Sequence, residues 1–559
     1  MLDGYILPKL PSQLEKALHL QKQRERDLLL STRMPVFDKL MPNYVTASIA
    51  LSFGGLLNGY DTGSIGAIVH MEQFKSSMGG MSAFITGITV STIMLTGIIP
   101  ALFAGHLADK YGRLRLIAPG AFVFGIGALL QATSTQLPQF IVGRAISGAG
   151  QGVFFGNITV YITEVAPLRS RGRLSALPQF MATTGVCIGY FACVSTTGQK
   201  SSLAWRLPYI VQVAVSAGLT LVCRFLPESP RWLALQGRGD EAQISLTRLD
   251  FDLNEARRDF LATVQEQSSL SNWQSFVLLF RRGYRPKTFL ALFILSMIQL
   301  SGIDAITYYA PSLFDQAGIS STSSSLIASG VSSIAMLLVS IPGFLLADRW
   351  GRRTSAISGG LLLAGIMLLM GTLYASGAVT PRSAASWVVV VCVFLFGMIF
   401  CATWGIVGKI YASEILPGNT RAAGNSVGMA CSFLTNWVVA LITPVLLNAS
   451  AFGAYFLFSG LALFTVGVLA IRMPETRGRS LEDIQASFRR PAQGLLSSLF
   501  RQQARTHQGA ATAANDSVPA LAGENQQEEI ELQPTAQGTA LARLPSIEAA
   551  ARGLRVETS

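Results

Sequence analysis

The segment YITEVAPLRSRG, residues 161–172, returns later in the chain as YASEILPGNTRA, residues 411–422. A tyrosine, a glutamate, a proline and an arginine recur in the same order. The offset is 250 residues for both the glutamate (414 − 164) and the arginine (421 − 171). Charged loops alone would not reproduce Tyr-x-x-Glu-x-x-Pro-x-x-x-Arg at one spacing, so the pattern indicates an internal repeat.

The composition indicates what is repeated. Of 559 residues, 50% are hydrophobic and only 13% are charged, against roughly 25% charged in a soluble domain. Runs such as SGGLLLAGIMLLMGTLYA and AYFLFSGLALFTVGVLAI approach the ~20 mostly apolar residues that cross a bilayer. Since many such runs recur, we predict an all-α membrane protein.

The apolar runs define the predicted organisation. We predict twelve transmembrane helices, at 44–67, 82–107, 115–135, 139–163, 174–197, 206–226, 287–311, 324–347, 355–376, 386–411, 421–447 and 452–472. The predicted domains are a cytoplasmic N-terminal segment (1–43), two six-helix bundles (44–226 and 287–472), a cytoplasmic linker with short amphipathic helices (227–286) and a cytoplasmic, mostly disordered tail (473–559).

Basic residues gather in alternate short loops. One set of loops carries Lys110, Arg113, Arg115, Arg169, Arg171, Arg173, Arg349, Arg352, Arg353 and Arg421, and the other set carries Lys75, Lys200 and Arg382. The positive-inside rule therefore predicts that both termini and the linker are cytoplasmic. This bias explains the net charge of +12, so no nucleic-acid partner is expected. The charged N-terminal segment has no compact apolar core, and we expect no cleavable signal peptide.

The sequence offers little for enzyme chemistry. The six cysteines all fall inside apolar runs and are interpreted as small buried hydrophobic residues without disulfides. There are only four histidines, and no spacing suggests a metal site or an activated nucleophile. We expect neither an enzyme nor a cofactor.

Two further charged motifs are also repeated. GHLADKYGRLR (105–115) returns as LADRWGRR (346–353), with the aspartates 239 residues apart (348 − 109). LPESPRWL (226–233) returns as MPETRGRS (473–480), with the glutamates 247 residues apart (475 − 228). The three motifs follow predicted helices 2, 4 and 6, and again 8, 10 and 12. The chain is therefore predicted to be two copies of a six-helix unit, as in transporters built on parallel repeats.

These motifs carry a resemblance to a known family. Together with GGLLNGYDTGSIGAI, GRAISGAGQG and QLSGIDAITYYAPSLF, in this order, they resemble the sugar porter family of the major facilitator superfamily over about residues 44–485. Fungal sugar and polyol transporters are the most similar members. The resemblance implies alternating access, in which two six-helix bundles rock about a central site.

The repeated motifs predict a cytoplasmic gate of ion pairs that break in each cycle. Its residues are Asp109, Arg113, Glu164, Arg171, Asp348, Arg352, Glu414 and Arg421. Partly exposed pairs have the moderate strength that such cycling requires. The alternative is charge that serves only topology. We favour a gate because each motif sets acids beside its arginines, which topology does not require.

Two charges fall inside predicted membrane helices, Asp61 and Arg144. Each costs at least ~2.5–3.5 kcal/mol at a helix centre, which is usually a sign of function. The resemblance implies a pair that protonation loosens, which couples proton entry to substrate movement. An apolar setting raises the pKa of a carboxyl group and an arginine lowers it, so a small rearrangement could release the proton. The alternative is a static pair that braces helices 1 and 4.

The resemblance also implies a substrate site. The matching positions hold Gln179, Gln299, Asp304, Tyr308, Tyr309, Trp404, Lys409 and Asn436. This chain departs from the family pattern, because Ile298 and Met336 replace amide side chains, Asp304 replaces an asparagine, and Lys409 falls within the altered tryptophan motif. Asp304 and Lys409 could form a structural ion pair, or they could bind a substrate carboxylate or amine or add a titrating group. Alternatively, Lys409 could extend to the inner surface.

We therefore predict a plasma-membrane carrier of a monosaccharide, a polyol or a related polyhydroxylated compound, driven by proton symport. Its expected partners are this small molecule, protons and the lipid bilayer. A facilitative uniporter and a carrier of a charged sugar-like acid are alternatives. A nutrient sensor that keeps the carrier fold without transporting is the alternative from a different class.

Overall fold

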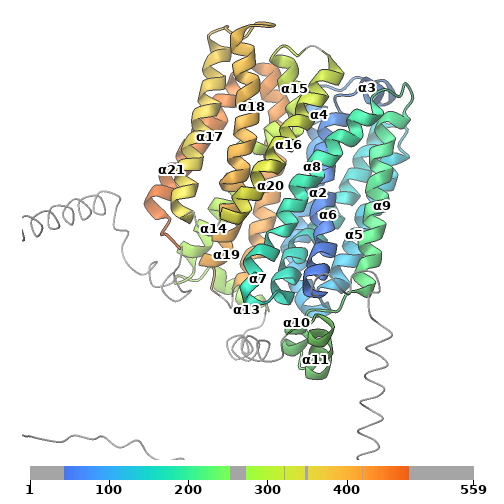
Figure 1. The fold of residues 1–559 in the computed structure, drawn as a ribbon, viewed down its shortest axis with the longest axis vertical. Helices are drawn as coiled ribbons and strands as arrows, with labels where there is room; N and C mark the ends of the chain where they lie inside the picture. The colour runs from blue at the N-terminus through green and yellow to red at the C-terminus, as the bar shows by residue number, and fades with distance from the viewer. Residues whose placement is uncertain (1–42, 252–271, 320, 347–350, 418–419, 477–559) are drawn as a thin grey trace, which may run out of the picture. The chain divides into compact units, whose positions relative to one another are not determined.

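The computed structural model describes residues 43–251, 272–319, 321–346, 351–417 and 420–476, which are helices and connecting loops with no strand among them (Figure 1). The long helices of the first half are α2 (Asn43–Ile68), α4 (Ala83–Tyr111), α5 (Leu114–Ala132), α6 (Leu137–Val165), α8 (Leu177–Thr196) and α9 (Leu203–Phe225). Those of the second half are α14 (Arg285–Gln299), α15 (Ile303–Gln316), α16 (Thr322–Leu346), α17 (Arg352–Ala375), α18 (Ala384–Ala402), α19 (Trp404–Ile415), α20 (Arg421–Ala449) and α21 (Gly453–Arg472).

Short helices link these elements: α3 (Glu72–Met78), α7 (Leu168–Ser175), α10 (Pro230–Leu235), α11 (Gly239–Arg248) and α13 (Asn272–Leu279). The last three lie within the predicted linker, residues 227–286. The predicted disordered tail lies almost entirely outside the described residues, and the domain boundaries stay predictions. Every described helix belongs to one compact unit, Met1–Leu495.

Ten stretches in the described part of the chain are long and apolar enough to cross a membrane. The other two predicted membrane helices correspond to α2 and α6. These two helices are the more polar ones, because they carry Asp61, Arg144, Gln151 and Asn157 among their buried residues. Their polar side chains are covered by neighbouring helices, so position within the bundle compensates for low hydropathy.

Two predicted helices are broken, which corrects the prediction of one continuous helix at 287–311 and at 386–411. The first is divided into α14 and α15 by a turn that ends at Gly302, whose φ of 91° is left-handed. A Cβ atom there would also lie 2.9 Å from Met367 and Phe458. The second is divided at Thr403, with φ −123° and ψ −85°. Broken membrane helices free backbone groups near the bilayer midplane, where transporters bind their substrates.

Glycines set the closest helix contact of the first half, between α2 and α8. Gly55, Gly59 and Gly63 recur every four residues and so share one face of α2. A Cβ atom on Gly59 would lie 1.8 Å from the carbonyl oxygen of Ala182. Small residues at this spacing let two membrane helices approach until their backbones touch.

Candidate functional site

The buried centre of the first half is an ion pair between α2 and α6. Arg144 Nη1 lies 3.2 Å from Asp61 Oδ1, and Arg144 Nη2 lies 3.3 Å from Asp61 Oδ2. The two side chains are 0% and 2% exposed. Arg144 also donates to the Val90 carbonyl at 2.9 Å. The predicted residues therefore do meet, fully withdrawn from solvent.

A third side chain, which sequence reasoning missed, completes this pair. Gln212 of α9 donates to Asp61 Oδ1 at 3.4 Å and to Ser64 Oγ at 3.2 Å. Arg144 Nε has no hydrogen-bond partner among the described residues. An amide in the middle of an apolar run was the available signal for Gln212. A buried polar atom without a partner is uncommon in proteins, and the choice between a proton-coupling pair and a static brace stays open.

The amide side chains that are predicted to form hydrogen bonds with a substrate lie in both halves. Gln179 on α8 and Gln299 at the end of α14 are half-buried. Asn436 on α20 is 5% exposed, and its amide oxygen has no partner within the described part of the chain. Ile298 and Met336 are buried apolar residues, so the centre offers fewer hydrogen bonds than the family pattern.

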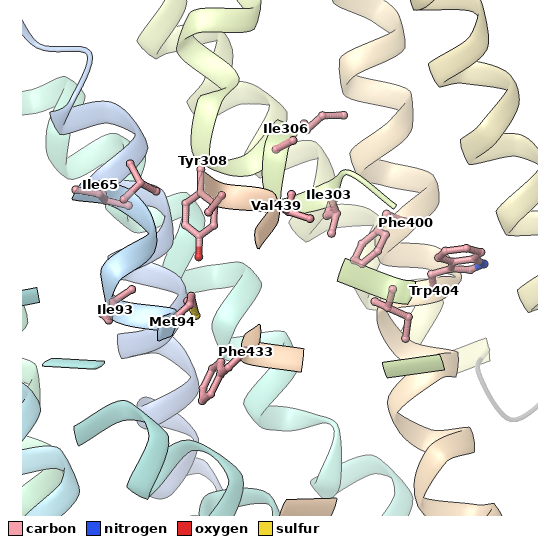
Figure 2. Close-up of a cluster of buried hydrophobic side chains, with 14 of the residues drawn as sticks. Ile65, Ile93, Met94, Ile303, Ile306, Tyr308, Phe400, Trp404, Phe433 and Val439 are labelled. Carbon is pink, nitrogen blue, oxygen red and sulfur yellow. The ribbon is translucent and has the colours of Figure 1, made fainter. Parts of the chain in front are cut away.

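The aromatic residues predicted for the substrate site, Tyr308, Tyr309 and Trp404, lie in the second half. Tyr308 on α15 lies opposite Ile65 and Met94 of the first half, while Phe400 and Trp404 lie farther along the second half (Figure 2). The Tyr309 hydroxyl donates to the Ala440 carbonyl at 2.6 Å. Trp404 Nε1 donates to the Ala356 carbonyl at 2.7 Å. In this structure Tyr309 and Trp404 therefore supply apolar surface, because their donors are already used.

Asp304 occupies the first turn of α15, directly after the break at Gly302, and is half-buried. A helix N-terminus stabilises a carboxylate, by typically 0.3–1 kcal/mol at an exposed position. Lys409 belongs to α19, but its side chain lies outside the described residues. Its pairing with Asp304 therefore stays a prediction.

The gate residues of the first half form a compact cluster at the end of α4. Arg113 binds Glu164 through two hydrogen bonds, Nε–Oε2 at 3.0 Å and Nη2–Oε1 at 2.8 Å. Its Nη1 lies 2.7 Å from Asp109 Oδ1. The Arg113 and Glu164 side chains are 5% and 9% exposed. Such two-pronged pairs are the stronger kind of charged hydrogen bond.

In the second half, one ion pair of the predicted gate lies among the described residues. Arg352 Nη2 lies 3.5 Å from Glu414 Oε1, and Thr476 Oγ1 donates to Glu414 Oε2 at 2.7 Å. Asp348 and the Arg421 side chain lie outside the described residues, and Arg171 is half-buried. These ion pairs join residues within one half, so pairing across the seam between halves stays a prediction.

Glu228 and Glu475, which are not part of the predicted gate, cap the N-termini of α5 and α17. Glu228 accepts from the backbone amides of Arg113 (3.1 Å) and Leu114 (3.2 Å) at the start of α5. Glu475 accepts from those of Arg352 (2.8 Å) and Arg353 (3.1 Å) at the start of α17. Burial raises the pKa of Glu228, although the amides that it accepts from act in the opposite direction. The recurrence of Glu228 as Glu475, 247 residues later (475 − 228), was the signal in the sequence for this capping role.

Two hydrogen bonds that join the halves lie toward the end opposite the gate motifs. The Tyr190 hydroxyl of α8 donates to the Thr307 carbonyl of α15. His70 Nε2, between α2 and α3, lies 3.4 Å from Ser325 Oγ of α16. The two halves are therefore tied together at the face predicted to be extracellular.

These features define a multi-pass helical membrane protein of the major facilitator type, with a buried ion pair and two repeated clusters of charge. The family model for "Sugar (and other) transporter" matches residues 47–488. The chain belongs to this family.

Known proteins agree with this assignment. The chain is 31% identical to the high glucose sensor RGT2 of Saccharomyces cerevisiae over 86% of its own length, and it spans 64% of that sensor. It is 30% identical to the glucose transporter GlcP of Staphylococcus epidermidis, covering 78% of this chain and 96% of GlcP. The proton:xylose symporter XylE of E. coli has the same fold, with a TM-score of 0.69 at 22% identity over 80% of this chain and 99% of XylE.

Proposed function

We propose that this protein is a plasma-membrane secondary transporter that moves a monosaccharide, a polyol or a related polyhydroxylated compound together with protons. The observation that carries the proposal is the Asp61–Arg144 pair, which is withdrawn from solvent and incompletely hydrogen-bonded at Arg144 Nε. A buried carboxylate in that setting can change its proton occupancy when the arginine moves. Proton symport is named for XylE, which supports the proposal by fold only.

Alternating access gives the charged clusters their role. The halves are joined near Tyr190 and His70, whereas the described gate pairs, such as Arg113–Glu164, form within a half. This distribution supports a state that is closed toward the predicted outside. In the opposite state, we infer, the arginines of both halves exchange partners across the cytoplasmic seam.

Uptake into proteoliposomes tests the coupling. Labelled sugars, polyols and sugar acids are supplied with and without an inward proton gradient. Asp61→Asn is expected to abolish accumulation against a gradient while exchange of substrate continues, because the variant cannot release a proton. Asp240→Asn, at an exposed position of α11, is the matched control. Gradient-driven accumulation by the Asp61→Asn variant would exclude Asp61 as the proton carrier.

A non-transporting sensor is the second candidate, because the high glucose sensor RGT2 is 31% identical. The same assay separates the two functions. A sensor binds a sugar from the panel but catalyses neither accumulation nor exchange. A transporter catalyses exchange even when the proton gradient is absent.

A further inference from the structure

A cavity of about 400 Å³ lies beside the turn between α4 and α5, away from the central site. It is lined by Lys110, Tyr111, Arg115, Trp232, Gln236 and Arg238. Three of these residues are basic and none is acidic. Ligand sites in proteins begin at about 300 Å³, so the cavity has room for a small molecule or for a headgroup.

The charge of the cavity is only partly neutralised. Arg238 is paired with Glu241, with Nη2–Oε2 at 2.5 Å and Nε–Oε1 at 2.7 Å. Lys110 and Arg115 are exposed and form no ion pair with the acids of the described chain. Arg115 lies in the first turn of α5, where the helix dipole makes a positive charge unfavourable. Lys110 Nζ lies over the Tyr111 ring, 5.2 Å from its centroid. The cavity therefore presents two positive charges that no described carboxylate neutralises.

Hydrogen bonds hold the aromatic wall in place. Trp232 Nε1 donates to the carbonyl of Asp109 at 2.7 Å, and Gln236 Nε2 donates to the same oxygen at 3.0 Å. Trp232 is only 4% exposed. These bonds fix α10 to the end of α4, so the cavity exists before any ligand binds, which lowers the entropic cost of binding. Loop charge that serves topology alone requires neither a cavity nor an anchored wall.

We propose that this cavity binds a phosphate-bearing anion on the cytoplasmic face, with the phosphate held between Lys110 and Arg115. Arginine and lysine are the usual phosphate ligands, the former through its planar fork and the latter as a point charge. Both an anionic phospholipid and a soluble sugar phosphate carry this group. The bound anion joins the α4–α5 turn to the α10–α11 segment. The site is independent of the transported substrate.

Binding is measured on the purified full-length protein by thermophoresis, in separate soluble and lipid experiments. The soluble probes are inorganic phosphate and glucose 6-phosphate. The lipid probe is a short-chain phosphatidylinositol phosphate, with short-chain phosphatidylcholine as the uncharged reference. In Lys110→Gln/Arg115→Gln, the Kd for the ligand that binds is expected to rise roughly 10- to 30-fold, as the loss of two basic contacts predicts.

A control variant removes the same charge elsewhere on this face. Arg173→Gln/Arg224→Gln changes two exposed arginines near the same ends of the helices, outside the cavity lining. Its Kd should stay within about two-fold of the original protein. Binding of the lipid probe alone assigns the site to a headgroup, and binding of a soluble probe assigns it to a free phosphate compound. Equal weakening in both double variants, or no binding of any phosphate probe, overturns the proposal.

Discussion

Each half has a carboxylate within a predicted membrane helix, Asp61 in the first half and Asp304 in the second. Asp61 is paired with Arg144, and the second half has no arginine at the position that corresponds to Arg144. Asp61 and Asp304 are 243 residues apart (304 − 61), within the 239 to 250 of the three repeated motifs. The position 250 residues after Arg144 is occupied by Phe394. The duplicated unit has thus kept an acid in each half while only the first half keeps the cation that makes a buried pair.

The charged clusters of the repeated motifs also have different described contacts in the two halves. In the first half Glu164 holds Arg113 through two short hydrogen bonds, whereas in the second Glu414 meets Arg352 at 3.5 Å and shares its other oxygen with Thr476. The helix caps by Glu228 and Glu475 are alike. The helix caps are thus the same in both halves, whereas the described contacts of the two predicted gate glutamates differ.

The largest effect is expected at the buried pair. Arg144→Met leaves Asp61 uncompensated, which typically costs ~3–5 kcal/mol, whereas removing both charges can be nearly neutral. We therefore expect Arg144→Met to express poorly or to melt at a much lower temperature. Asp61→Asn/Arg144→Met should recover most of the stability but none of the coupled transport. A double variant as unstable as Arg144→Met would show that the two charges do not depend on each other.

A smaller and unequal effect is expected at the gate. Glu164→Gln breaks a buried two-pronged pair and should lower stability by ~2–3 kcal/mol, while Glu414→Gln should cost about 1 kcal/mol or less. Thermal unfolding in detergent gives this comparison, and initial uptake rates at matched surface expression give the effect on turnover. Arg421→Ala should likewise slow turnover. Unchanged rates in all three variants would remove these charges from the mechanism.

Substitution of Asp304 tests the comparison with the Asp61–Arg144 pair more sharply. Because Asp304 is half-buried, Asp304→Asn is expected to cost less than Arg144→Met, ~1–2 kcal/mol. If Lys409 is its partner, Asp304→Asn/Lys409→Met will recover much of the loss. If Lys409 binds a substrate carboxylate, the double variant will fold but stay inactive towards that substrate. Strictly additive losses of stability would leave Lys409 as a residue that extends to the inner surface.

The smallest effect on stability is expected at the two helix caps, which are alike in both halves. Glu228→Gln and Glu475→Gln each weaken a helix cap but keep an oxygen that can accept from the same amides. Each should lower stability by ~0.5–1 kcal/mol, and the two losses should be equal within error. A loss several times larger in one half would mean that its glutamate does more than cap a helix.

The sequence already contained the two six-helix units and the charged motifs, because membrane length, polarity and repeat spacing are local properties of the chain. It also placed Asp61 and Arg144 in the interior, where structure finds them paired. The sequence did not predict which side chains of distant helices would contact these groups. Gln212 joins the pair from α9, and Trp232 meets the carbonyl of Asp109 from α10, and neither contact follows from a pattern within one helix.

The sequence by itself determined that this chain is a doubled six-helix membrane protein, since hydrophobic length and repeated charge require no knowledge of packing, and its motifs carried the resemblance to the sugar porters. Only the tertiary structure decided where the helices break and which side chains meet the buried charges. Gly302 and Thr403 interrupt helices whose hydropathy is continuous. The physical reason is that a break, a buried ion pair or an anchored cavity depends on atoms brought from several helices, and their distances are set by packing.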